Sequence, residues 1–340
     1  MEKRYAGVIL LVLIIGLLLG CASGVNPKGT DSLSEEPEEM EDYIVVGYSQ
    51  IGSESDWRNA NTESFRTTFT EENGYYLIFD DGQQKQENQI KAIRKFILRG
   101  VDYIVLDPVV ETGWEAVLQE AKDAGIPVIL ADRSVDVEDD SLYICWVGSD
   151  FTKEGRRAGL WLADYLEKQG RSEEEIRIVT LQGTPDSSAQ LGRTQGFEEV
   201  LNEHSNWVML ERASGDFVQS KGREVMEYFL DTYEDIDVVV SENDNMTFGA
   251  MEALQKAGKT YGQDGDVVLI SFDTVRAALE AVQRKEINAD FECNPLLAPM
   301  VSGIIKKLEN GEAVDKIQYV EETYYDSFMD LEESIKERTY

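Results

Sequence analysis

Short apolar runs alternate along the chain with longer segments in which apolar residues recur every three or four positions. The short runs are typical of strands in a parallel sheet buried on both faces, and the longer segments are typical of amphipathic helices. Strands are predicted at 43–49, 75–79, 102–106, 127–131, 142–147, 176–181, 207–211, 238–241, 267–271, 287–291 and 317–319. Helices are predicted at 55–72, 86–98, 114–124, 153–168, 188–203, 218–230, 246–257, 298–308 and 331–338.

Two breaks divide this alternation. The strand at 142–147 leaves no room for a helix before it, and the segment 292–295 (ECNP) interrupts the pattern again. With 340 residues, the chain is also too long for one ordinary core. We predict an α/β protein of two doubly wound parallel-sheet lobes, joined by a multi-strand hinge and separated by a cleft. The first lobe would comprise 43–148 and 294–322, and the second 149–293 and 323–340.

The first 42 residues have a different character. Lys3 and Arg4 precede an apolar run at 8–19, which is typical of a secretory signal and short for a membrane span. The run ends in Leu-Leu-Gly-Cys, which resembles the cleavage site of bacterial lipoproteins. Residues 1–20 are therefore predicted to be a signal peptide and Cys21 a lipidated N-terminus; an uncleaved anchor or a buried helix is the alternative. Residues 21–42 would form an acidic tether on an extracytoplasmic membrane surface.

Charge and composition narrow the possible partners. The formal net charge of −34 disfavours nucleic acid and anionic lipid, so lipidated Cys21 would provide the membrane anchor. Cys145 and Cys293 could pair, although two free buried thiols are favoured. A single histidine, His204, disfavours a histidine metal site or a His-based triad, and the nucleotide-binding glycine motifs are missing. We expect a monomer with no cofactor and no metal.

Polar and aromatic side chains follow most of the predicted strands. Because ligands of α/β sheets collect at the carboxyl ends of strands, these side chains should converge on the cleft. Carboxylates and arginines suit the hydroxyl groups of a neutral polyol, and an aromatic ring can cover the apolar side of a sugar. The candidate sugar-binding residues are Ser53, Glu54, Trp57, Arg58, Asp132, Arg133, Arg193, Asn243, Asp273 and Glu292.

Each of these signals has a structural alternative. The pair Asp132 and Arg133 could form a surface salt bridge, and Asp273 could be the N-cap of a following helix. Trp57 could be a core anchor, and Asn243 could belong to a turn. The recurrence of such residues after successive strands, rather than any one of them, supports the prediction of a site.

Several segments resemble the periplasmic-binding-protein type I superfamily, among them DGQQKQENQI, PVVETGW, GRTQGF and ENDNMTFGAMEAL. Within that superfamily they are most similar to the galactofuranose-binding proteins of ABC importers, and the ribose-binding proteins are more distant. The resemblance implies two lobes that close on a sugar by a hinge motion, with Trp57 and Arg58 covering and bonding it. It further implies contacts from Asp132 and Arg133 in the first lobe, and from Arg193, Asn243 and Asp273 in the second.

The chain departs from the family pattern at three places. Asp56 stands where a small residue is common, Asp107 stands where the closer relatives are apolar, and Cys293-Asn294 alters the hinge. Glu292 occupies a hinge-side position at which the family has a polar ligand contact. These departures bear on which sugar is bound more than on the class of ligand.

The leading functional prediction is a lipid-anchored receptor, not an enzyme, that delivers a monosaccharide to the permease of an ABC importer. Presentation of the closed lobes to a sensor kinase or chemoreceptor is the alternative. A glycosidase using two of Asp132, Asp273 and Glu292 is more remote, because a closed site leaves little access for water. A transcriptional repressor is disfavoured because no basic segment precedes residue 43.

Overall fold

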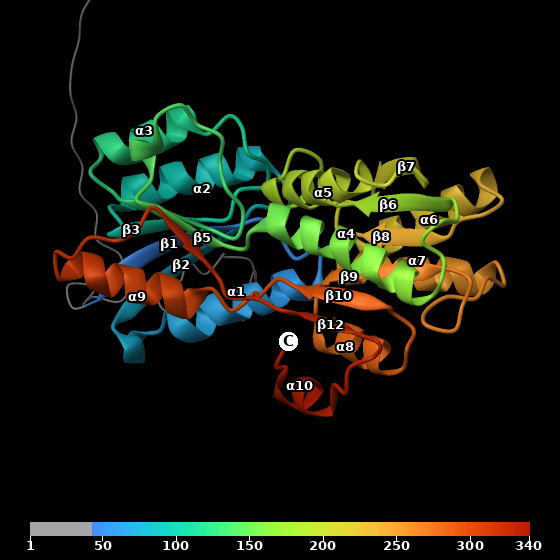
Figure 1. The fold of residues 1–340 in the computed structure, drawn as a ribbon. Helices are drawn as coiled ribbons and strands as arrows, with labels where there is room; N and C mark the ends of the chain where they lie inside the picture. Colours follow the sequence, from blue (N-terminus) through green and yellow to red (C-terminus); the bar gives the residue numbers. More distant parts are fainter. Residues whose placement is uncertain (1–42) are drawn as a thin grey trace, which may run out of the picture. The chain divides into compact units, whose positions relative to one another are not determined.

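The computed structural model describes residues 43–340. The predicted signal peptide, the tether and Cys21 therefore lie outside the described residues. Two six-stranded sheets, each covered by helices on both faces, account for the described chain (Figure 1). The predicted fold class, two doubly wound parallel-sheet lobes, is confirmed.

The first sheet has the strand order β2-β1-β3-β4-β5-β11, with all neighbours parallel. Its strands are β1 (Ile44–Gln50), β2 (Tyr75–Asp81), β3 (Tyr103–Leu106), β4 (Val128–Ala131), β5 (Cys145–Gly148) and β11 (Ile317–Tyr319). Helices α2 (Gln86–Arg99) and α3 (Glu115–Asp123) cover one face, where Phe96 and Leu118 are fully buried. Helices α1 (Asp56–Thr68) and α9 (Ala298–Glu309) cover the other, through Phe65 and Val301.

The second sheet has the order β7-β6-β8-β9-β10-β12. Its strands are β6 (Ile176–Gln182), β7 (Trp207–Ser214), β8 (Val238–Ser241), β9 (Val268–Asp273), β10 (Ala289–Glu292) and β12 (Tyr324–Asp326). Helices α4 (Phe151–Lys168) and α5 (Ser188–Leu201) pack on one face. Helices α6 (Gln219–Thr232), α7 (Asp244–Lys256) and α8 (Arg276–Gln283) pack on the other, and α10 (Glu332–Glu337) lies against α8.

One strand of the second sheet was not predicted. Strand β12 has only three residues and pairs antiparallel with β10 at the sheet edge, so it is too short to show a period of two. The helix expected to follow Asp273 is α8, which begins at Arg276 and has eight residues. The start of β5 is also later than predicted, because Asp140–Leu142 forms a 3-10 turn.

The chain passes between the sheets three times: after β5, after β10 and between β11 and β12. The carboxylate of Glu322, in the third crossing, accepts hydrogen bonds from the Ser149 hydroxyl of the first crossing (2.6 Å) and the Asn294 N–H of the second (2.8 Å). The Glu322 side chain therefore connects the three crossings by hydrogen bonds. No helix within residues 43–340 combines the length and apolar character needed to cross a membrane.

Candidate functional site

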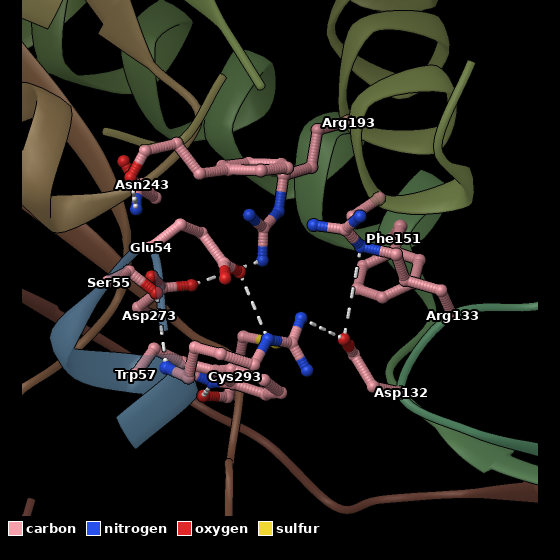
Figure 2. A pocket seen from close by; sticks show the side chains of 13 residues that line it. Glu54, Ser55, Trp57, Asp132, Arg133, Phe151, Arg193, Asn243, Asp273 and Cys293 are labelled. Atoms are coloured by element: carbon pink, nitrogen blue, oxygen red, sulfur yellow. Dashed lines mark hydrogen bonds and ion pairs between the residues drawn. The ribbon is translucent and has the colours of Figure 1, made fainter. Parts of the chain in front are cut away.

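A pocket of about 290 Å³ lies where the carboxyl ends of strands from both sheets meet. Figure 2 shows side chains of both lobes directed toward this space. The lining residues are Glu54, Ser55, Trp57, Arg58, Asp132, Arg133, Phe151, Ala189, Arg193, Phe217, Asn243, Asp273 and Cys293.

Arg58 organises the first-lobe half of the pocket. Its guanidinium contacts three carboxylates, those of Glu54 (3.0 Å), Asp107 (3.2 Å) and Asp132 (2.5 Å). All four side chains are at least 95 % buried, so these are charge-assisted bonds shielded from water. The cluster fixes the Arg58 side chain at the pocket wall before any ligand arrives.

Arg133 is the second guanidinium of this half. It donates to the Val109 carbonyl (3.0 Å) and lies 3.9 Å from the Asp132 carboxylate. Burial and the neighbouring Arg58 lower the pKa of Arg133 to about 10. Arg133 is therefore still charged near neutral pH, and its buried Nε, the atom nearest Asp132, makes no hydrogen bond to another residue of the described chain. That nitrogen is a donor available to a ligand.

Asp107 lies behind Arg58 at the end of β3. Its Oδ2 accepts from the Tyr48 hydroxyl (2.8 Å) and from Arg58, and burial raises its pKa to about 8. The Tyr48 hydroxyl also bonds Asn61, whose amide donates to the Pro295 carbonyl near the second crossing. The departure noted at Asp107 thus belongs to a buried network that supports the pocket rather than lining it.

Arg193 organises the second-lobe half. It donates to Glu154 (2.7 Å) and lies 3.4 Å from an oxygen of Asp273, and all three side chains are at least 94 % buried. Burial raises the pKa of both carboxyls despite the nearby guanidinium. This half therefore holds more acidic groups than its single arginine compensates.

Two further buried acids lie behind Asp273. Asp244 accepts from the Ser271 hydroxyl (2.5 Å) and the Val275 N–H (2.8 Å). Asp290 is fully buried and lies against Asp244 and the Thr274 backbone N–H. Burial and their mutual repulsion raise the pKa of Asp244, which can then donate its proton to Asp290.

Three aromatic rings complete the lining. The Trp57 indole donates from Nε1 to the Cys293 carbonyl (2.7 Å), and the Arg58 guanidinium stacks 4.6 Å from the ring centroid. Phe151 and Phe217 lie beneath Arg193 and Arg133, at 5.4 and 5.1 Å from the ring centroids. The pocket therefore combines apolar faces with fixed donors and acceptors, which is the pattern of a small-molecule site.

The backbone at this edge adopts unusual conformations. Asp132, Phe217 and Asp273 have φ values of 57°, 63° and 109°, in the region that residues other than glycine rarely occupy. Each follows or ends a strand, and each side chain lines the pocket. Such strain clusters at functional sites, where the surrounding structure holds it in place.

The structure brings together eight of the ten predicted site residues: Glu54, Trp57, Arg58, Asp132, Arg133, Arg193, Asn243 and Asp273. Two predictions are corrected. Ser53 is exposed, and its neighbour Ser55 lines the pocket instead while capping α1. The Glu292 carboxylate turns away, because it bonds Arg338 (2.7 Å) and the Thr323 N–H (3.1 Å).

The structural alternatives are also resolved. Asp132 and Arg133 are buried, so they form no surface salt bridge. Val275, not Asp273, precedes α8 as its cap residue. Trp57 belongs both to the core and to the pocket lining, and Asn243 caps α7 while facing the pocket. Cys145 and Cys293, the cysteines of the described chain, are free and buried, as favoured.

Five lining residues were not predicted: Ser55, Phe151, Ala189, Phe217 and Cys293. Phe217 follows β7, a strand end that the sequence analysis left out, so the same reasoning could have found it. Phe151 begins α4 directly after the first crossing. Ala189 carries no chemical signal, and only the packing of α5 places it in the pocket.

One group of side chains among residues 43–340 has the spacing of metal ligands. Atoms of Glu154, Cys293 and Glu322 lie within 4.8 Å of one another. Arg193 already supplies a positive charge at Glu154, and burial raises the pKa of Glu322 to about 9, so that it keeps its proton at neutral pH. These contacts account for the group as part of the hydrogen-bonded crossing between the lobes.

Two parallel-sheet lobes with a pocket of charged and aromatic side chains at their facing strand ends define a two-lobe ligand-binding protein. A family model for the periplasmic binding protein domain matches residues 46–292. The chain belongs to this family, and the predicted resemblance is confirmed.

Among curated relatives, the galactofuranose-binding protein YtfQ of Escherichia coli (strain K12) is 42% identical over 286 residues, which cover 83% of this chain and 87% of the relative. A Mycobacterium smegmatis protein in complex with β-D-fucofuranose is 42% identical with a TM-score of 0.80, covering 84% of this chain and 92% of that one. The binding protein of the arabinose ABC transporter from Shewanella sp. ANA-3, bound to α- and β-L-arabinofuranose, is 38% identical with a TM-score of 0.80, covering 87% and 95%.

Proposed function

We propose that this chain is the sugar-binding component of an ABC importer and that it binds a furanose monosaccharide between its lobes. The observation that carries the proposal is the pocket itself, in which Arg58 and Arg193 face each other with their carboxylates across about 290 Å³. The three relatives above are named for, or were solved with, a sugar in the furanose form.

The lining chemistry supports a neutral polyol over a charged ligand. Both arginines are already paired with carboxylates, so neither presents an uncompensated charge for an anion. The carboxylates can accept from hydroxyl groups, and Arg133 Nε can donate to a ring or hydroxyl oxygen. Trp57, Phe151 and Phe217 would then cover the C–H faces of the sugar.

The same pairing disfavours catalysis. Glycoside hydrolysis needs two carboxyl groups free to act as acid and as nucleophile or base. Asp132 is held by Arg58, Asp273 lies against Arg193, and Glu292 lies outside the pocket. We therefore propose a role in binding alone, with turnover of a glycoside as the observation that would overturn it.

Delivery of the sugar to the permease would take place outside the cytoplasm. We propose that the first lobe comprises residues 43–148 and 294–322, and the second lobe residues 149–293 and 323–340. The three crossings between the sheets would serve as the hinge, and lipidated Cys21 would hold the protein beside the permease. Mass spectrometry of the N-terminal peptide from membranes tests the anchor. An unmodified Cys21, or a retained segment 1–20, would contradict it.

Calorimetric titration tests the binding proposal. The full chain, purified in a detergent without a sugar headgroup, would be titrated with D-galactose, D-fucose, L-arabinose and D-ribose. We expect saturable one-to-one binding of at least one sugar at micromolar concentration or below, accompanied by a change in Trp57 fluorescence. A crystal structure of that complex would identify the ring form. Failure of all four sugars to bind tighter than millimolar would overturn the proposal.

A further inference from the structure

The two lobes are joined at the pocket rim by a reciprocal pair of hydrogen bonds between Asp56 and Asn245. The backbone N–H of Asp56 donates to Asn245 Oδ1 (2.9 Å), and Asn245 Nδ2 donates to Asp56 Oδ2 (3.1 Å). Asp56 is the first residue of α1, and Asn245 is the second residue of α7. The pair therefore connects one helix of each lobe across 189 positions of sequence.

Electrostatics gives Asp56 a second role in this arrangement. The N-termini of α1 and α7 meet here, and each carries a partial positive charge and free N–H groups. Two such ends repel each other unless negative charge lies between them. The Asp56 carboxylate supplies that charge, and its bond to Asn245 places it where both helix ends benefit.

The pair belongs to the rim and not to the sugar site. Neither residue lines the pocket, whereas their neighbours Ser55 and Asn243 do. On the other rim, Glu111 N–H donates to the Asp186 carbonyl (3.0 Å), and Ser134 N–H donates to Ser188 Oγ (3.0 Å). In those two contacts the first-lobe partner is a backbone amide, whereas in the Asp56–Asn245 hydrogen bond each lobe contributes a side chain.

We propose that Asp56 and Asn245 form a latch that holds the lobes closed and so sets the affinity for the sugar without touching it. The inference rests on the proposed function, because it assumes lobes that close on a ligand. Apparent affinity falls in proportion to the fraction of molecules able to close. Both are positioning residues, because they would set the distance between the lobes without contacting the sugar. Asp56, which departs from the family pattern, would then have a role in lobe closure.

A donor–acceptor exchange tests the latch. Asn245→Asp places two carboxylates against each other and should weaken sugar binding about tenfold, because the closed state loses a hydrogen bond and gains repulsion. Adding Asp56→Asn restores one donor and one acceptor, with their positions exchanged, and should return affinity to within about threefold of the native chain. Gln255→Glu, at an exposed position near the far end of α7, adds the same charge away from the latch and is the matched control.

A second measurement reports closure without any sugar. Dyes on cysteines introduced by Lys91→Cys in α2 and Glu224→Cys in α6, both exposed, would report energy transfer between the lobes of the full chain. We expect Asn245→Asp to change the transfer and the double variant to restore it. Unchanged affinity and transfer in Asn245→Asp, or no recovery in the double variant, would overturn the latch. If the native chain binds no sugar, the proposed function fails, while the transfer measurement still decides on the latch.

Discussion

The two halves of the pocket solve the problem of buried charge in different ways. In the first lobe, Arg58 and Arg133 stand against Glu54, Asp107 and Asp132, so most of the negative charge is met by a guanidinium. In the second lobe Arg193 contacts the carboxylates of Glu154 and Asp273. Three further buried acids, Glu242, Asp244 and Asp290, form no ion pair with an arginine among the described residues. Burial raises the pKa of all five.

The difference shows two ways to bury a carboxyl group: ionised beside a cation, or neutral with its proton retained. The first half depends mainly on its ion pairs, and Asp107 is the member whose pKa is raised, to about 8. The second half depends more on protons: the pKa of all five acids is raised, that of Glu242 to about 7. Both halves should therefore respond to pH near neutrality, the first through Asp107 and the second through several acids.

The largest expected effect comes from removing the central arginine of the first half. Arg58→Met keeps much of the side-chain volume but removes the guanidinium that contacts Glu54, Asp107 and Asp132, with Arg133 left 3.9 Å from Asp132, and should lower the free energy of unfolding by ~3–5 kcal/mol. Arg193→Met leaves acids whose pKa is already raised and which can take up protons, so we expect only ~1–3 kcal/mol. Urea unfolding at pH 7 measures both. An equal loss in the two variants would contradict the contrast.

The next largest effect is expected at Trp57, whose ring lines the pocket. Trp57→Phe keeps an aromatic face but leaves the Cys293 carbonyl without its donor, which should cost ~1–3 kcal/mol of stability. Sugar affinity should fall about tenfold because the smaller ring covers less of the ligand. Calorimetry and urea unfolding separate the two readouts. Unchanged affinity with lost stability would leave Trp57 as a core residue only.

A third change isolates the proton of the second half. The pKa values of Asp244 and Asp290 are raised in the folded state. Their contribution to folding stability is therefore fully present below about pH 4, the pKa of an unfolded aspartate. This contribution is lost as the pH rises through the pKa values of the folded state. Asp290→Asn supplies an N–H to Asp244 at every pH. At pH 8 it should be more stable than the native chain by ~1–3 kcal/mol, and the gain should shrink toward pH 4.

Asp231→Asn, at an exposed position of α6, serves as the control for that change. Its stability should follow the native profile at every pH. A gain in Asp290→Asn that did not depend on pH would contradict a shared proton and would leave Asp290 simply as a strained buried charge.

The smallest effect separates two serines of the same strand end. Ser55 accepts from the Arg58 N–H as the N-cap of α1, so Ser55→Ala should cost ~1 kcal/mol of stability. Ser53 is exposed, and Ser53→Ala should change stability by less than ~0.5 kcal/mol and leave sugar affinity unchanged. Thermal unfolding with calorimetry measures both. A loss of affinity in Ser53→Ala would restore it to the site.

Most of the site could be predicted because its residues follow strands at fixed positions. Asp132 and Asp273 stand at the ends of strands, and Trp57 and Arg58 begin the helix after the first strand; in a parallel sheet those positions face one edge. Glu292 stands at an equivalent position and was misassigned. Its partner Arg338 lies 46 residues further along, in a tail whose path has no local signature.

The amino-acid sequence by itself determined the alternation of strands and helices, the two-lobe class and the strand ends that carry the polar residues, because these follow from local periodicity and turn chemistry. The tertiary structure alone decided which of those residues pair, which face the pocket and how the halves share charge. The reason is distance along the chain: Trp57 meets Cys293 after 236 positions, and Asp56 meets Asn245 after 189. Contacts of that kind depend on how two lobes approach each other, which no local pattern of residues encodes.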